Sequence, residues 1–206
     1  MFGSFIYSFY LYTHNQYSNT MEATETKTIG KYKIEIIPVD NPYNPRTDDN
    51  LGTMVCFNRR YTLGDKHDFR NSDDLNDFLS RNKTKIGVIL PLYLYDHSGI
   101  TMNTTGFSCH WDSGQVGIIF ITKAKIREEY SCMRISKKLI EMVTKYLVGE
   151  VETYDQYLTG DVYGYRITDT DTEEEVESSW NFYGSEYCMT EATGIVGHIL
   201  KAEEVK

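Results

Sequence analysis

Short apolar runs separated by turn residues recur along this chain, and they constrain its fold more than any other feature. Each run has the length and the β-branched or aromatic content of a strand. The longest run contains Pro91, which places part of it at a sheet edge or a bulge. The run at 53–57 is apolar throughout, which predicts a central strand. Six runs of this kind lie at 32–37, 53–57, 86–95, 115–122, 162–168 and 176–183, and 100–105 is compatible with one more short strand.

Helical periodicity is clearest at 136–147, where apolar residues three and four apart form one face. Shorter helices are predicted at 72–79, 124–130 and 191–200, the last weakened by two glycines. The last two strand runs flank the charged turn at 169–173, which predicts a β-hairpin with an acidic tip. About six strands and three to four helices predict an α+β fold with a mostly antiparallel sheet and an acidic C-terminal β-hairpin.

The length of 206 residues suits one domain, and a hydrophobic fraction of 40% is enough to form a core. Within residues 1–20, the stretch 2–12 is aromatic and apolar but lacks a basic start and a small-residue cleavage site. We expect them to be an N-terminal extension ahead of Met21. The remaining residues, 21–206, are then a single α+β domain in which 160–187 forms a hairpin sub-lobe.

Charge is unevenly distributed along the chain, which carries a net charge of −9. Residues 123–138 hold six Lys and Arg against two Glu, whereas residues 150–177 hold ten Asp and Glu against one Arg. These charges are either solvated faces or a dipolar surface. In the second case the basic part would hold a phosphate backbone and the acidic part would face a basic protein.

Single-stranded RNA is commonly bound by cationic side chains together with aromatic rings. One segment of the chain combines the two kinds of residue, and a second segment adds further basic charge. One follows the apolar run at 53–57, and the other follows the run at 115–122. The candidate nucleic-acid-binding residues are Arg59, Arg60, Tyr61, Lys66, His67, Lys123, Lys125 and Arg127.

Histidines beside acids offer acid–base chemistry. His97 lies between Asp96 and Ser98, and His110 precedes Trp111 and Asp112. Neutral imidazole can act as a general base near pH 7, so the candidate catalytic residues are His97, His110 and Asp96. The same residue types are also common in turns, because Asp caps local backbone N–H groups. They could equally contact a ligand without chemistry, so whether the protein is an enzyme stays open, with a binding role favoured.

Several motifs of metal and cofactor sites are missing from the sequence. The four cysteines form no C-x-x-C pair, and no two histidines have the helical i, i+4 spacing of a zinc site. The chain has no P-loop and no G-x-G-x-x-G. We therefore predict no metal and no cofactor. Trp111 and Trp180 are expected to pack in the core or on the hairpin rather than to form a stacking surface.

Four runs of the sequence carry a family resemblance. They are DNLGTMVCFNRRYTLGDKH at 49–67, LPLYLYDHSGI at 90–100, WDSGQVG at 111–117 and EVETYDQYLTGDVYG at 150–164. Together they resemble an uncharacterised family of accessory proteins from bacteriophages, prophages and mobile elements, over roughly residues 30–185. That family has no assigned catalytic residues, so none is transferred to this chain. The chain also resembles phage anti-CRISPR proteins that act on type III complexes.

The resemblance implies a phage-encoded accessory protein that acts in the cytoplasm of a bacterial host. The expected partner is a host defence ribonucleoprotein or nuclease, bound alone or together with RNA, and no membrane association is expected. The leading hypothesis is a counter-defence binding protein. The alternatives are a small metal-dependent or acid–base nuclease or hydrolase that uses the His and Asp turns, and a phage replication or transcription accessory protein.

Overall fold

The computed structural model describes residues 22–204, so the expected extension at 1–20 lies outside the described residues. The described part of the chain forms eight strands, four α-helices and one short 3-10 helix, in an α+β arrangement. The strands are β1 (Glu25–Ile29), β2 (Tyr32–Pro38), β3 (Thr53–Cys56), β4 (Ile86–Asp96), β5 (Ile100–Asn103), β6 (Ser113–Thr122), β7 (Val162–Asp169) and β8 (Glu175–Tyr183). The helices are η1 (Pro45–Thr47), α1 (Ser72–Arg81), α2 (Lys123–Glu129), α3 (Lys137–Thr159) and α4 (Ser185–Glu204).

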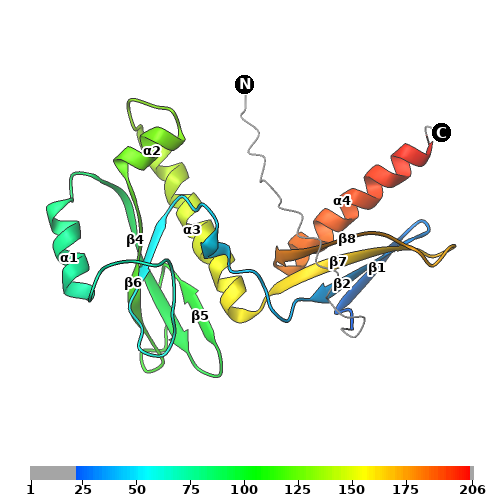
Figure 1. The fold of residues 1–206 in the computed structure, drawn as a ribbon, viewed down its shortest axis with the longest axis horizontal. Helices are drawn as coiled ribbons and strands as arrows, with labels where there is room; N and C mark the ends of the chain where they lie inside the picture. The colour runs from blue at the N-terminus through cyan, green and yellow to red at the C-terminus, as the bar shows by residue number, and fades with distance from the viewer. Residues whose placement is uncertain (1–21, 205–206) are drawn as a thin grey trace.

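The strands form two four-stranded antiparallel sheets rather than one, and the two lie side by side (Figure 1). The sheet β1–β2–β7–β8 and α4 are built from residues 22–40 and 160–204, which hold five Lys and Arg against fifteen Asp and Glu. We call this part the acidic lobe. The sheet β3–β6–β4–β5 and the other helices come from residues 41–159, which hold fifteen of each charge. We call this part the neutral lobe.

In the neutral lobe, helices cover both faces of the sheet. The long helix α3 packs its buried Val143, Leu147 and Val151 on one face, where alternate strand residues such as Ile119 point. The short helix α1 covers the other face through Leu75 and its contacts with the β3 and β6 side chains. Each buried aliphatic side chain of this kind contributes about 1.5–3 kcal/mol of transfer free energy. The sheet is therefore the middle of three layers, and the loops lie at the two ends of its strands.

The position of β3 differs from the sequence prediction. Its apolar run predicted a central strand, but β3 lies at the sheet edge and pairs only with β6, apart from an isolated bridge between Val55 and Gly64. The run is apolar because both of its faces are covered: Met54 points to the α3 side and Val55 to the α1 side. An uninterrupted apolar run therefore indicates that both faces of a strand are buried, and it does not show whether the strand is central or at the edge of its sheet.

In the acidic lobe, α4 covers one face of the sheet through buried Cys188, Ala192 and Val196. The predicted β-hairpin is present as β7 and β8, with the exposed acidic residues 170–177 at its tip. It pairs through β7 with β2, so residues 160–187 belong to a larger unit with β1, β2 and α4. The strand number is higher than the expected six because β5 forms and because the polar strand β1 pairs with β2 across a turn at Gly30, whose φ is +60°.

Two chain crossings join the lobes, at 39–52 and at 159–161, and few side chains support them. The Val39 N–H donates to the Val162 carbonyl over 2.9 Å, and the Tyr43 N–H donates to the Asn181 side chain over 3.0 Å. The Tyr183 hydroxyl donates to the Tyr43 carbonyl over 2.7 Å. None of the helices in the part of the chain that the structure describes is long and apolar enough to span a membrane.

Candidate nucleic-acid interface

The loop at 57–71 joins β3 to α1 at one end of the neutral lobe, and its conformation is fixed by local bonds. The Asn58 side chain accepts from the backbone N–H groups of Arg60 and Tyr61, which forms a turn. Gly64 has a φ of +72°, and a Cβ there would lie 2.7 Å from the Met54 carbonyl oxygen, so this close approach requires glycine. Unstructured loops of this length are usually functional or disordered, and this one is held in place.

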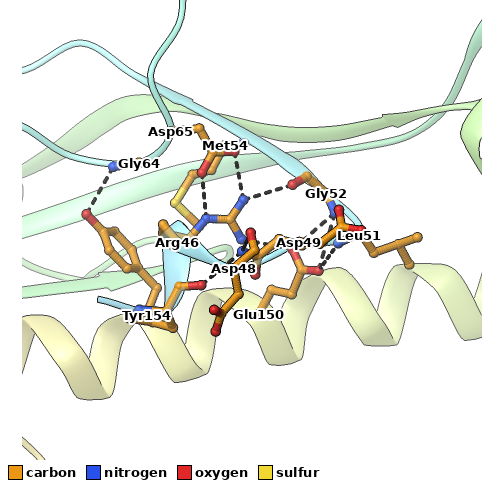
Figure 2. Close-up of polar contacts among 12 residues, drawn as sticks. Arg46, Asp48, Asp49, Leu51, Gly52, Met54, Gly64, Asp65, Glu150 and Tyr154 are labelled. Carbon is orange, nitrogen blue, oxygen red and sulfur yellow. Dashed lines mark hydrogen bonds and ion pairs between the residues drawn. The ribbon is translucent and has the colours of Figure 1, made fainter. Parts of the chain in front are cut away.

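A buried ion cluster fixes the base of the same loop (Figure 2). The Arg46 guanidinium is only 2% exposed and donates to both oxygens of Asp65 at 2.8 Å and to Glu150 at 3.0 Å. It also donates to the Gly52 carbonyl at 2.8 Å. The two carboxylates hold the pKa of Arg46 above its ordinary value against the opposing effect of burial. Because Asp65 is paired with Arg46, its negative charge is partly offset and opposes an anion in the loop above it less than a free carboxylate would.

The ion cluster also ties the carboxylates to backbone. Glu150 accepts from the N–H groups of Leu51 and Gly52, and Asp65 accepts from the Met54 N–H at 2.8 Å. The cluster therefore joins the interlobe segment, the loop at 57–71 and α3 in one network. A buried charge is tolerated only when it is paired and hydrogen-bonded, and every partner here meets that condition.

Above this base lies a groove of about 640 Å³ that the loop lines with cations and aromatic rings. Four residues from the sequence-predicted set line it: Arg59, Tyr61, Lys66 and His67. Arg70 adds a third cation that the sequence reasoning did not include. Among the residues that the structure describes, neither Arg59 nor Lys66 has a carboxylate partner within 4.0 Å. Their charges are thus available to an anionic ligand.

His67 has a structural place at the floor of the groove. Its Nε2 lies 3.2 Å from the Cys56 carbonyl oxygen, so Nε2–H donates, and the buried Nδ1 has no hydrogen-bond partner within the described residues. The ring packs between Phe57 and Phe69 at centroid distances of 5.1 and 5.8 Å. Burial raises the pKa of the neighbouring Cys56 thiol to about 12, so this thiol stays protonated at neutral pH and is a poor nucleophile.

Arg60 and Tyr61 converge on Asp96 at the edge of the groove. Arg60 Nη1 lies 2.8 Å from Asp96 Oδ2, and the Tyr61 hydroxyl donates to Asp96 Oδ1 over 3.1 Å. The guanidinium also lies over the Tyr61 ring at 5.5 Å from the centroid. Both oxygens of Asp96 are therefore engaged, which leaves this predicted catalytic carboxylate in a supporting role.

The predicted catalytic histidines lie in two different surroundings. His97 Nδ1 is 3.4 Å from Asp112 Oδ2, and the side chain of His97 is exposed. His110 instead lines a separate hollow of about 470 Å³ together with Tyr93 and Phe107. In the described ranges no group of three or more His, Cys, Asp or Glu could hold a metal ion. The structure thus places His97 against Asp112, while Asp96 binds Arg60 and Tyr61 and His110 lines the hollow.

The basic residues of α2 do not line the groove. Lys123, Lys125 and Arg127 follow the C-terminal end of β6, whereas the loop of the groove leaves β3 opposite Gly117, about 17 Å from that end at 3.3 Å per strand residue. All three donate to backbone carbonyls: Lys123 to Thr84, Lys125 to Asn50 and Arg127 to Met133. Of the eight predicted nucleic-acid-binding residues, four therefore line the groove, Arg60 binds Asp96 beside it, and the three residues of α2 lie outside it.

The groove and the loops around it share one end of the neutral lobe. Asp96 links them, because its side chain binds Arg60 and Tyr61 while its N–H donates to the Asp112 carbonyl over 2.8 Å. Arg59, Lys66 and Arg70 supply the cationic character of the groove, and the contact of Arg60 and Tyr61 with Asp96 could not be derived from sequence spacing. Comparison with known protein families, with curated proteins and with solved structures finds no match to this chain.

Proposed function

We propose that the protein is a phage counter-defence binding protein whose neutral lobe holds a short stretch of single-stranded RNA. The observation that carries the proposal is the groove at 57–71, in which Arg59 and Lys66 lie with Tyr61 and have no carboxylate partner among the residues that the structure describes. Positive grooves with aromatic side chains are the recurring design of single-strand binders. The phage setting and the defence target rest on the family resemblance alone, so they are parts of the proposal that need their own test.

The groove explains how an acidic protein could bind an anion. Fifteen of the thirty Asp and Glu lie in the neutral lobe, where fifteen Lys and Arg balance them. Asp65, the carboxylate that lines the groove, is already bound to Arg46. Repulsion from the acidic lobe is screened beyond about 8–10 Å at physiological salt. An RNA held at the loops of the neutral lobe thus experiences the local cations more than the distant acids.

RNA binding is tested by fluorescence anisotropy with a labelled single strand of about twelve nucleotides, a length within the usual site sizes. Replacing Arg59→Glu together with Lys66→Glu should weaken binding about tenfold or more, because two attractive contacts become repulsive. With two phosphate contacts, log affinity should fall with log salt with a slope of about −1.4 for a single strand.

The matched control is Lys83→Glu, an exposed residue that follows the far end of α1. This substitution makes the same change of charge as each of the two groove substitutions, but it should leave the RNA affinity unchanged within about twofold. Equal weakening by Lys83→Glu would mean that only net charge matters. No measurable binding by the unchanged protein would overturn the RNA-binding proposal.

The partner is tested by affinity capture from a bacterium that expresses a type III CRISPR ribonucleoprotein. Subunits of that complex should co-purify with the protein, and the Arg59→Glu, Lys66→Glu variant should retain fewer of them. RNase treatment separates contact through RNA from contact through protein, because only the first is removed. Absence of the complex from the purified material would contradict the defence-target part of the proposal and leave RNA binding to be judged by anisotropy.

The contact between His97 and Asp112 favours one second function, acid–base cleavage of RNA. A carboxylate that orients an imidazole is the usual arrangement of a general base, and Ser98 beside it has a φ of +58°. Cleavage of labelled RNA that disappears in a His97→Ala, His110→Ala variant would establish this function. Under the binding proposal, the RNA stays intact and the affinity of that variant is unchanged.

A further inference from the structure

The side chain of Trp111 is almost entirely exposed, with 96% of its surface accessible. This exposure is the reverse of the core packing that the sequence suggested. Tryptophan is among the most buried residue types on average, because its large apolar area is costly to leave in water. A single fully exposed Trp at a functional end of a molecule is the type of residue that dominates binding energy at interfaces.

The loop that carries Trp111 is held by its own hydrogen bonds. The Asn103 side chain accepts from the N–H groups of Thr105 and Gly106 at 3.0 and 2.7 Å and donates to the Gly106 carbonyl at 3.2 Å. Ser113 Oγ donates to the Cys109 carbonyl at the other side of Trp111. The indole is therefore presented on a fixed loop, which lowers the entropy that a ligand must remove on binding.

Trp111 follows a residue that lines a second hollow. His110 lines this hollow of about 470 Å³, whose walls include Tyr93 and Phe107. A hollow of this size is within the range of small-ligand sites, and aromatic rings beside hydroxyl and imidazole groups suit a nucleobase. Exocyclic amino and carbonyl groups of a base could bond to Ser108 or His110, while the base stacks on the indole.

Trp111 is also continuous with the cationic groove. Asp112 follows it in the chain, and Asp112 contacts His97 through its side chain and Asp96 through its backbone. Asp96 in turn binds Arg60 and Tyr61 at the groove edge. A chain of residue contacts therefore links the loop of the cations to the loop that carries the indole. A single strand with its phosphates near Arg59 and Lys66 can extend along this path.

We propose that Trp111 and the hollow beside it form a base-stacking subsite for the same single-stranded RNA that the cationic groove holds. The inference rests on the proposed function, and it divides the recognition into two parts. The groove at 57–71 binds the backbone and contributes the salt dependence, while the indole binds a base and is insensitive to salt. Every base has a π-face, so the subsite tolerates different sequences.

The test uses the tryptophan itself as the probe. The full chain contains two Trp, so a Trp180→Phe variant reports on Trp111 alone. Titration with an oligouridine single strand should quench its fluorescence, since stacking on a base quenches indole. A deoxyribonucleotide strand of equal length that quenches also supports the subsite, because stacking involves the base and not the 2′-hydroxyl. Unchanged fluorescence at RNA concentrations that saturate anisotropy would overturn it.

Substitution gives the second readout. Trp111→Ala should weaken RNA binding about tenfold, Trp111→Phe should keep most of the affinity, and the salt slope should be unchanged in both. Because the side chain is exposed, neither change should alter the urea midpoint. Met133→Ala, at another residue with 92% exposure, is the control and should have no effect. An unchanged RNA affinity in Trp111→Ala would overturn the stacking subsite and leave the groove proposal standing. In that case only the Arg59→Glu, Lys66→Glu variant would lose affinity, which would assign RNA binding to the groove.

Discussion

Each lobe is built on a four-stranded antiparallel sheet, yet the two lobes handle charge in opposite ways. The neutral lobe covers its sheet on both faces and buries an ion cluster around Arg46. The acidic lobe covers its sheet with α4 and keeps its ion pairs near the surface, such as the contacts of Lys31 with Asp169 and Glu203. The whole-chain charge of −9 comes from the acidic lobe. Charge counted over a whole chain therefore gives the wrong expectation for a ligand that meets only one lobe.

The largest expected effect comes from removing the buried cation of the neutral lobe. Arg46→Met leaves Asp65 and Glu150 without their partner in a largely buried site, which should lower the free energy of unfolding by about 3 kcal/mol. Urea unfolding followed by circular dichroism measures this loss. Arg60→Met removes the exposed ion pair with Asp96 and should cost less than about 1 kcal/mol.

The same variant also tests whether the lobes are independent. The fluorescence of Trp180, which lies on β8, reports on the acidic lobe in a Trp111→Phe background. Since the two lobes have separate cores and few connecting side chains, Arg46→Met should move the circular dichroism transition to lower urea and leave the Trp180 transition in place. A joint shift of both transitions would show that the two lobes unfold as one unit.

Two glycines give the next comparison, because each faces a close neighbour in its own lobe. A Cβ at Gly117 in β6 would meet the backbone carbonyl of Val55, which strand pairing holds in place. A Cβ at Gly164 in β7 would meet the ring of Trp180, a side chain that can move. Gly117→Ala should therefore cost about 3 kcal/mol and Gly164→Ala about 1 kcal/mol, measured by urea unfolding.

The control for these two changes is Gly114→Ala. Gly114 lies in the same strand as Gly117 and has open space where its Cβ would be. This change should leave stability the same or raise it by a few tenths of a kcal/mol, because it restricts the unfolded chain. An effect of Gly164→Ala as large as that of Gly117→Ala would mean that Trp180 is held as firmly as a paired strand.

Much of the fold could be predicted because the deciding signals are local. The run at 86–95 became β4, the period of 136–147 became part of α3, and the turn at 169–173 became the β7–β8 hairpin. The strand β1 was missed because its exposed residues are polar, and it forms only through pairing with β2. A division into two sheets depends on pairings far apart in the chain, such as β2 with β7, that no local pattern reveals.

The candidate site divides in the same way. Arg59, Tyr61, Lys66 and His67 are close in the chain, so one loop could bring them to one groove. The residues of α2 were grouped with them by charge, and only the pairing of β3 with β6 shows that they follow a different part of the sheet and do not line the groove. The exposure of Trp111 had no sequence signal, because a Trp between His and Asp is equally compatible with burial.

The smallest expected effect is a pH dependence that belongs to the acidic lobe. The Tyr32 hydroxyl, at 2.8 Å, and then the Lys31 ammonium lower the pKa of Glu203 below its ordinary value of 4.5. The Asp171 N–H, followed by Lys31, lowers the pKa of Asp169. A carboxyl group whose pKa is lower in the folded state stabilises the fold above its unfolded pKa, and this stability is lost as the pH falls through the folded pKa.

Glu203→Gln should therefore destabilise the acidic lobe at pH 7, and its difference from the unchanged protein should shrink below about pH 4.5, when Glu203 itself becomes protonated. Urea unfolding followed by Trp180 fluorescence at a series of pH values measures this difference. The neighbouring Glu204→Gln removes the same charge from an exposed residue, so it separates the hydrogen-bonded contact from general repulsion within a lobe rich in acids. If the two variants show the same pH profile, relief of repulsion between acids dominates the stability of the acidic lobe. Its surface ion pairs would then add no net stability, unlike the buried cluster around Arg46.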